Sequence, residues 1–507
     1  MQYYVQKLVI GAVLLAGILL AFYFGINVGD GDYKGILLFV GLSVVLAIFG
    51  LVKDNTWVFI PIAIVIKWKF NFLPGRFTVF EFVILAGTAF YLTSYLSFQK
   101  RMLRVGPVWI WLPFAILFSI ILYHWYMGGI GMNLLGGETF GARRNLNFIF
   151  ALLAFSLILT LRKGDMMSLE RLPLIYCLST LVAIVPLYIT TFFPSTSGVI
   201  YQLFGMYDAS AYEQMVSGFS GDEAAKRQGE LATFTTALQV LLITRYKITS
   251  WWHPGRLWVL LLSVLCLYGT LASGFRGALF VYVVVNSVAA FMTLRWKVLP
   301  FLLIGLVGMV FLTMGQNRVF NLPVMVQRSL SFLPGEWDDS AMKSALASNA
   351  FRESMKTIYL EEFAMRSPWI GTGFQFDPSQ FMNRGIQVGL NAADESREFI
   401  TRKDYHIGWI SVYDTTGIVG SVAFCLLCLA FLLKAGVFMF KARQAKPVQI
   451  WACAYVIAEV ITYFTTFGAL QNTIVQLACY GGVLYVALDD LPEHERQKLE
   501  NPEIGKS

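Results

Sequence analysis

The sequence predicts an all-helical protein that crosses a membrane many times. Of its 507 residues, 57% are hydrophobic and only 14% are charged, whereas about a quarter of the residues in a soluble domain are charged. The mean hydropathy is +0.63. Apolar runs of about 20 residues, the length that spans a bilayer as a helix, recur along the chain. The predicted class is therefore a polytopic membrane protein.

Fourteen apolar runs meet or approach the length of a membrane-spanning helix. They cover residues 8–28, 34–52, 56–72, 78–97, 107–126, 145–162, 172–193, 231–246, 257–273, 277–294, 298–315, 408–433, 449–468 and 472–488. The run at 56–72 is the weakest, because Lys67 and Lys69 interrupt it. We expect the first run to be a retained span, since no small-residue cleavage site follows it.

Basic residues in the short connections predict how these spans are oriented. Lys and Arg are more frequent in the loops after even-numbered spans than in the short loops after odd-numbered ones, and cytoplasmic loops carry this excess. Both termini are therefore predicted in the cytoplasm, with one long polar loop on the outer face. The same rule accounts for the net charge of +8, so the charge gives no reason to expect a nucleic-acid partner.

The long polar loop divides the chain into four predicted parts. An N-terminal transmembrane bundle covers 1–315, and the external loop covers 316–407. C-terminal transmembrane helices follow over 408–490, and a cytoplasmic tail over 491–507. No other gap between apolar runs holds so many charged residues, so this loop is the predicted place for chemistry at one membrane face.

An amphipathic helix near 340–366 is the main predicted element of the external loop. Residues Asp338 to Ser340 offer N-terminal caps, and Pro368 would end the helix. Its apolar side chains fall near one face: Phe351, Met355, Ile358 and Met365. We expect this helix to lie on the membrane surface or over the bundle.

Several predicted outer segments carry an arginine at or next to a helix end: Arg143, Arg144, Arg227 and Arg276. The long loop adds Arg352, within its predicted helix. Burying an arginine in hydrocarbon costs about 2.5 to 3.5 kcal/mol on insertion scales, so an inward-facing one needs a partner. The planar guanidinium suits the oxygens of phosphate and diphosphate. The arginines therefore predict a site for an anionic head group.

Each arginine also has a purely structural interpretation. Arg143 and Arg144 can extend to lipid phosphates at the interface. Arg227 can pair with nearby carboxylates, and Arg352 can belong to the polar face of its helix. Arg276 is the hardest to explain in this way, because the short turn SGFRG holds it at the bilayer surface.

His406 is the candidate general base. It precedes the span that begins at 408, and an imidazole titrates near neutrality, as a general base must; ordinary packing is the alternative. Of the other histidines, His253 is predicted inside and His494 in the tail. His124 ends a span at an aromatic interface, where an anchoring role is favoured.

Metal and nucleotide chemistry find little support in the sequence. It contains no H-E-x-x-H pair, no histidine cluster and no G-x-x-x-x-G-K-[ST] phosphate loop. All six cysteines fall in apolar runs, which predicts no disulfide framework. The C-x-x-C pair Cys425 and Cys428 is interpreted as packing. We therefore expect neither a metal ion nor a cofactor.

The chain contains, in order, the segments SGFRGALF, SNAFRESMKTIYLEEFAMRSPWIGTGFQF and DYHIGWISVYDTTGIVG. Together they resemble the O-antigen ligase/polymerase family of bacterial membrane glycosyltransferases. That family has an S-R-G-like turn, a long periplasmic loop with a P-x-x-G-x-G-like turn, and a histidine before a span that reads roughly E-x-G-x-x-G. Here Asp414 stands at the acidic position of the last motif. The chain departs from the pattern at Phe275, which precedes the arginine of the turn, and at Ile407, where the family often has asparagine.

The resemblance implies a metal-independent glycosyltransferase that needs no cofactor. Its donor would be a glycan on undecaprenyl diphosphate, and its acceptor another glycan or the lipid A core. By matching position, Arg227, Arg276 and Arg352 would hold the diphosphate, and His406 would deprotonate or orient the acceptor hydroxyl. The arginine pair at 143–144 matches no motif and could help to hold the donor. The implied location is the bacterial inner membrane, with the active site facing the periplasm.

Two other functions stay open at this point. A transporter or flippase of lipid-linked glycans would place its charged residues along a cavity at mid-membrane, whereas the predicted arginines gather at one face. A non-catalytic membrane protein of polysaccharide assembly would use the long loop to bind a partner protein. The sequence does not distinguish a polymerase from a ligase, because both use the same donor.

Overall fold

The computed structural model describes residues 51, 53–66, 68–69, 77–96, 107–128, 143–161, 169–196, 198, 200, 228–364, 366–374, 392–442 and 444–489. Within these residues the regular structure is helical, with two isolated bridges between single residues. The all-helical prediction is confirmed for this part of the chain. The predicted span 8–28, nearly all of 34–52 and the predicted tail 491–507 lie outside the described residues.

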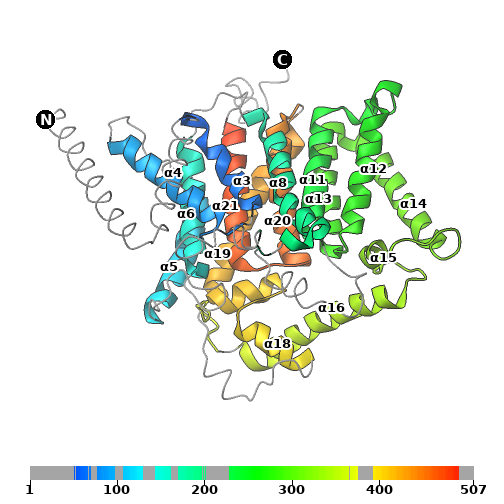
Figure 1. Ribbon diagram of the computed structural model, residues 1–507. Coiled ribbons are helices and arrows are strands. Elements are labelled where there is room, and N and C mark those ends of the chain that lie inside the picture. The colour runs from blue at the N-terminus through cyan, green and yellow to red at the C-terminus, as the bar shows by residue number, and fades with distance from the viewer. Residues whose placement is uncertain are drawn as a thin grey trace.

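The helices follow the chain in three groups (Figure 1). Before the long loop they are η1 (Lys53–Val58), α3 (Phe59–Val65), α4 (Val79–Leu96), α5 (Val108–Met127), α6 (Arg143–Leu161), α8 (Leu172–Phe192), η2 (Pro194–Thr196), α11 (Gly229–Arg245), η4 (Ile248–Ser250), η5 (Pro254–Arg256), α12 (Leu257–Ala272), α13 (Arg276–Leu294), η6 (Arg295–Val298) and α14 (Leu299–Gly315). The loop holds α15 (Val324–Leu330), α16 (Asp339–Ile358), the π-helical turn η7 (Tyr359–Phe363) and α18 (Ala392–Thr401). The last group is α19 (Gly408–Lys441), α20 (Pro447–Thr465) and α21 (Leu470–Asp489).

Six helices among the described residues are long and apolar enough to cross a membrane. They are Val108–Met127, Arg143–Thr160, Pro254–Ala272, Arg276–Gly315, Gly408–Lys441 and Pro447–Thr465. The predicted span 56–72 is instead the short pair η1 and α3, which ends at Val65, just before the predicted lysine interruption. The count of fourteen spans stays a prediction.

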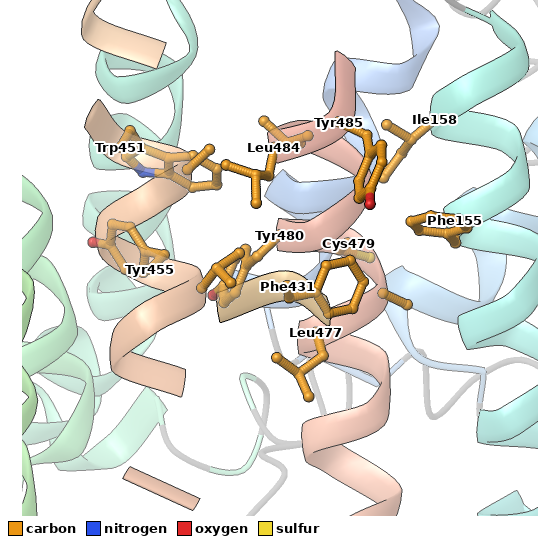
Figure 2. Packing of buried hydrophobic residues seen from close by; sticks show 14 of the residues in the cluster. Phe155, Ile158, Phe431, Trp451, Tyr455, Leu477, Cys479, Tyr480, Leu484 and Tyr485 are labelled. Atoms are coloured by element: carbon orange, nitrogen blue, oxygen red, sulfur yellow. The ribbon is translucent and has the colours of Figure 1, made fainter. Parts of the chain in front are cut away.

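The core of the bundle lies where α21 packs between α6 and α20. Figure 2 shows Phe155 of α6 on one side of α21 and Trp451 of α20 on the other. The Phe155 and Tyr485 rings meet edge to face with centroids 6.2 Å apart, and the Tyr176 and Tyr480 hydroxyls lie 3.1 Å apart. In a membrane, such packing and interhelical hydrogen bonds associate helices, because lipid is as apolar as the side chains.

The outer faces of α12 and α14 are apolar and exposed. On α14 the exposed side chains include Leu303, Ile304, Leu306, Val307 and Phe311. A soluble protein would bury such a surface, and contiguous exposed apolar patches mark membrane or protein contacts. These faces fit contact with lipid chains, and with the six candidate spans they identify a membrane protein.

The helices of the long loop lie across one end of the bundle (Figure 1). Asp338 caps α16 by accepting a hydrogen bond from the Ser340 amide at 2.8 Å. Met355 and Ile358 are buried in a small core that also includes Ile400 of α18 and Ile410 of α19. The sequence predicts this helix to 366, but the α-helix ends at 358. A π-helical turn follows, which the Ala364 amide closes on the Tyr359 carbonyl at 2.9 Å.

Candidate functional site

The candidate site forms where the turn Pro368–Gly373 docks into a break in α19. At Gly417 the backbone leaves the helical conformation, with φ 65° and ψ −165°, so neighbouring amides and carbonyls lose their helical partners. The turn supplies replacements through four backbone hydrogen bonds: Thr372 N to Asp414 O (2.7 Å), Gly373 N to Thr415 O (3.0 Å), Ile418 N to Pro368 O (2.8 Å) and Val419 N to Trp369 O (3.1 Å). The break and the turn therefore form one structural unit.

Two glycines allow this close approach of backbone to backbone. A Cβ on Gly371, whose φ is +73°, would lie 2.5 Å from the Thr415 carbonyl carbon, and a Cβ on Gly417 would lie 2.3 Å from the Trp369 carbonyl carbon. A side chain at either position would separate the two segments. From the end of α5, His124 Nε2 lies 2.8 Å from the Ile370 carbonyl oxygen. A carbonyl can only accept, so this nitrogen carries the proton.

Asp414 is the centre of a buried polar network at this junction. Its side chain is 3% exposed and forms an ion pair with Lys403. The Tyr405 hydroxyl donates to the same carboxylate. Thr372 Oγ1 and Tyr359 Oη also donate to it, at 3.2 and 3.4 Å. Lys403 Nζ donates to Thr372 Oγ1 at 2.6 Å as well, so the lysine links the turn to the helix.

The two tyrosines of this network are held as neutral donors. Burial first, and then the negative charge of Asp414, raises the pKa of Tyr405 and of Tyr359 well above the ordinary phenol value. Both phenols therefore keep their protons at neutral pH and can donate to the carboxylate. A buried carboxylate with one cation and several donors is a satisfied charge, which is the condition for keeping it in the interior.

Arg143 and Arg144, both predicted to bind donor phosphates, begin α6 at the same end of the bundle as the loop. Arg143 Nε lies 3.0 Å from a carboxylate oxygen of Glu81 on α4, with both side chains buried. Arg144 forms an ion pair with Asp404 and donates a second hydrogen bond to the Arg402 carbonyl. Both arginines therefore tie α6 to neighbouring segments.

Arg276 is the first residue of α13 and reaches across to α16. Its Nη2 donates to the Ala345 carbonyl and to Asn349 Oδ1, each at 3.1 Å. Arg352 follows Asn349 by three positions, so the two share one face of α16. Partial burial lowers the pKa of Arg352, but a guanidinium stays charged at neutral pH. Two of the predicted arginines thus converge on one helix.

His406 packs on the same stretch of α16. Its ring lies against Phe351, Phe399 and Phe467, with centroids 5.7, 5.4 and 5.1 Å away, and it is half-buried. The contacts of Arg276 and His406 on α16 fall within Ala345–Phe351, a stretch of roughly 9 Å along the helix axis. Asn349 and Phe351 are two positions apart, so Arg276 and His406 contact different faces of this stretch.

Arg227, the remaining candidate, lies outside the described residues. Its neighbour Gln228 donates its amide hydrogen to the Ser273 carbonyl at 3.0 Å. Ser273 begins the turn that leads to Arg276, so the start of α11 adjoins that turn. Among the described residues there is no group of three or more His, Cys, Asp or Glu side chains that could hold a metal ion.

Sequence reasoning missed several residues of this junction. Lys403, Asp404 and Tyr405 stand directly before His406 in the motif KDYH, yet nothing local shows that they bind Asp414 and Arg144. His124 looked like an interfacial anchor, but it bonds to the docked turn. The available signal was the charged run next to the candidate base, since charges beside a functional group often fix its position.

Comparison with known protein families gives one match. The family model described as O-antigen ligase matches residues 261–425. This segment contains Arg276, Arg352, His406 and Asp414, together with the docked turn. No curated protein matches the chain.

Proposed function

We propose that this membrane protein is a glycosyltransferase. The premise is the O-antigen ligase match over residues 261–425, which supports assigning the chain to the O-antigen ligase/polymerase family. The protein moves a glycan from undecaprenyl diphosphate to a second glycan or to the lipid A core. The reaction takes place at the outer face of the bacterial inner membrane and requires neither a metal ion nor a cofactor.

The observation that carries this proposal is that Arg276 and His406 both contact the short stretch of α16 that leads to Arg352. Two guanidinium groups bind diphosphate oxygens, and an imidazole at the same stretch accepts a proton. Arg276 also begins a helix of 19 residues. The residue before it, Phe275, has no side-chain oxygen to cap the helix, and the positive end of a helix dipole favours an anion.

These residues divide the transfer between them. The acceptor hydroxyl attacks the anomeric carbon of the donor sugar, and His406 takes the hydroxyl proton. The bond from the anomeric carbon to the diphosphate oxygen breaks, and its electron pair stays on the lipid diphosphate. Arg276 and Arg352 stabilise the negative charge that develops on that oxygen; losing one such donor costs about 2.7 to 4 kcal/mol of transition-state stabilisation.

The placement of the loop supports activity at one membrane face. The first turns of α6 and α13, the end of α5 and the start of α19 all contact residues of the long loop. The distribution of Lys and Arg in the short connections favours the outer face for this end. A flippase would place its cations along a mid-membrane cavity instead.

The test uses purified full-length protein in detergent with a lipid-linked oligosaccharide as donor and EDTA present. We expect chain growth, or transfer to a lipid A-core acceptor, that survives EDTA. Arg276→Ala should lower the turnover by about 10²–10³-fold, and His406→Ala by about 10²–10⁴-fold. Thermal unfolding of each variant, followed by tryptophan fluorescence, checks that the fold is kept.

Arg318→Ala is the matched control for Arg276→Ala. Arg318 lies in the same loop, but it is 65% exposed and pairs loosely with Glu336 at 3.5 Å. We expect full activity in this variant. Folded Arg276→Ala and His406→Ala proteins with wild-type turnover would rule out the assigned roles, and inhibition by EDTA would rule out metal independence.

A further inference from the structure

The segment that leads to His406 forms hydrogen bonds and ion pairs with residues of two helices, α6 and α19. Arg144 of α6 binds the carbonyl of Arg402 and the carboxylate of Asp404. Asp414 of α19 binds the side chains of Lys403 and Tyr405. The contacts therefore alternate along the chain: residues 402 and 404 bind Arg144, and residues 403 and 405 bind Asp414.

The segment is short and lies between two helices, α18 and α19. Lys403 has a positive φ of 60°, which ends the turn after α18. After Lys403 the chain is no longer helical until α19 begins, and Ile407, the residue before α19, has an extended backbone with φ −131° and ψ 116°. Within this short segment Asp404 binds Arg144 and Tyr405 binds Asp414, and His406 is the next residue.

The far side of His406 is fixed as well. The Tyr463 hydroxyl donates to the Gly408 carbonyl at 2.6 Å. A Cβ on Gly408 would lie only 2.1 Å from the Tyr463 carbonyl oxygen, so the chain passes α20 closely at this point. His406 therefore lies between two anchored positions, Tyr405 and Gly408, and its ring packs against Phe351, Phe399 and Phe467.

We propose that Arg144 and Asp414 are positioning residues that set the place of His406 and couple it to the docked turn Pro368–Gly373. The role of His406 rests on the proposed function, but the geometric coupling does not. Asp414 joins the three parts directly, since Lys403 and Tyr405 lead to His406 and Thr372 belongs to the turn. A movement of the turn is thereby transmitted to the imidazole.

This role differs from the phosphate binding first expected of Arg144. Its guanidinium directs Nη1 to Arg402 and Nη2 to Asp404, both on the segment before His406. The side chain is 4% exposed, so it lies within the protein. It acts through the segment, and Arg276 and Arg352 stay the residues proposed to hold the donor.

The test measures the exposure of His406 and the transfer reaction in the same full-length variants. Diethyl pyrocarbonate modifies accessible imidazoles, and mass spectrometry gives the rate at His406 relative to the exposed His253. We expect Asp414→Asn and Arg144→Gln to raise this ratio about tenfold, because hydrogen bonds to charged groups hold the segment closed. Tyr405→Phe, which removes a single hydroxyl, should raise it less and keeps the test valid if Asp414→Asn does not fold.

The kinetic readout separates positioning from binding. We expect kcat to fall by about 10–100-fold, as displacement of a reacting group by about 1 Å does, while KM for the donor stays within about twofold. A loss confined to KM would instead assign Arg144 to donor binding and overturn its positioning role.

The exposed pair Arg318 and Glu336 supplies matched controls in the same loop. Arg318→Gln and Glu336→Gln should change neither the modification ratio nor kcat. Folded Asp414→Asn, Arg144→Gln and Tyr405→Phe proteins with unchanged modification and unchanged kcat would overturn the proposal while leaving the transferase function intact. If the wild-type protein shows no transfer activity, but these substitutions still increase the modification of His406, then the coupling is supported and the proposed function is refuted.

Discussion

The two parts of α19 are held in place by different interactions. Its first part, Gly408–Gly417, buries Asp414, Thr415 and Thr416 and pairs its broken backbone with the docked turn. Its second part buries apolar side chains against α5, α20 and α21, including Phe424, Leu427, Phe431 and Phe438. Both parts belong to one continuous candidate span of 34 residues.

The difference shows how one helix can join a scaffold to a site. The apolar part depends on shape and volume, which several side chains can satisfy. The polar part depends on individual hydrogen bonds and on two glycines, so no substitute satisfies it equally well. We therefore expect the first part to respond sharply to single-atom changes and the second part to tolerate larger ones.

The largest effect is expected at the break itself. Gly417→Ala would place a methyl group 2.3 Å from the Trp369 carbonyl carbon, at a φ of +65°. The backbone region is nearly exclusive to glycine, and strain there with overpacking costs about 2 to 5 kcal/mol. The measurement is thermal unfolding in detergent, followed by tryptophan fluorescence.

The matched control lies in the second part of the same helix. A Cβ on Gly436 meets no atom within 4 Å, and glycine in a helix is less favourable than alanine by about 1 kcal/mol. Gly436→Ala should leave the midpoint unchanged or slightly raised. Equal losses in the two alanine variants would show that the two parts of α19 do not differ as described.

A smaller effect is expected at the contact that supports the turn from α5. His124→Ala removes the 2.8 Å hydrogen bond to the Ile370 carbonyl and the ring that covers Gly373. Loss of this hydrogen bond should cost about 1 to 2 kcal/mol. Hydrogen exchange of the backbone amides of Thr372 and Gly373 should accelerate, while the amides of α20 and α21 keep their protection. Unchanged exchange in the turn would mean that His124 gives it no support.

The smallest effect is expected in the apolar part. Phe431 packs against Phe155 and Tyr485, with ring centroids 6.3 and 6.2 Å apart. Phe431→Leu keeps an apolar side chain of similar reach and should cost less than about 1.5 kcal/mol. Transfer activity should stay within a fewfold of wild type. A severe loss of activity at wild-type stability would place Phe431 in the site and break the division between the two parts.

Much of the candidate site could be proposed from the sequence because Arg276 and His406 stand next to helix starts and Arg352 lies on a predicted helix of the loop. Arg276 and His406 both contact the stretch of α16 that leads to Arg352. Arg143 and Arg144 were selected by the same reasoning, but they pair with Glu81 and Asp404. In the sequence, an arginine of the proposed site cannot be told from one in a structural ion pair, because the partner lies far away in the chain.

The sequence by itself determined the helical membrane fold, since the length of the apolar runs and their lack of charge are local properties that make a helix stable in the hydrocarbon core of a bilayer. It also predicted the end of α14 at Gly315 and the starts of α16 and α19 to within a residue or two, but not the end of α16 at Ile358. The tertiary structure alone decided that the turn at Pro368 closes a break at Gly417, and that Asp414 and Arg144 grip the segment before His406. The physical reason is that buried polar groups must find partners, and these partners lie up to some 260 positions away in the chain.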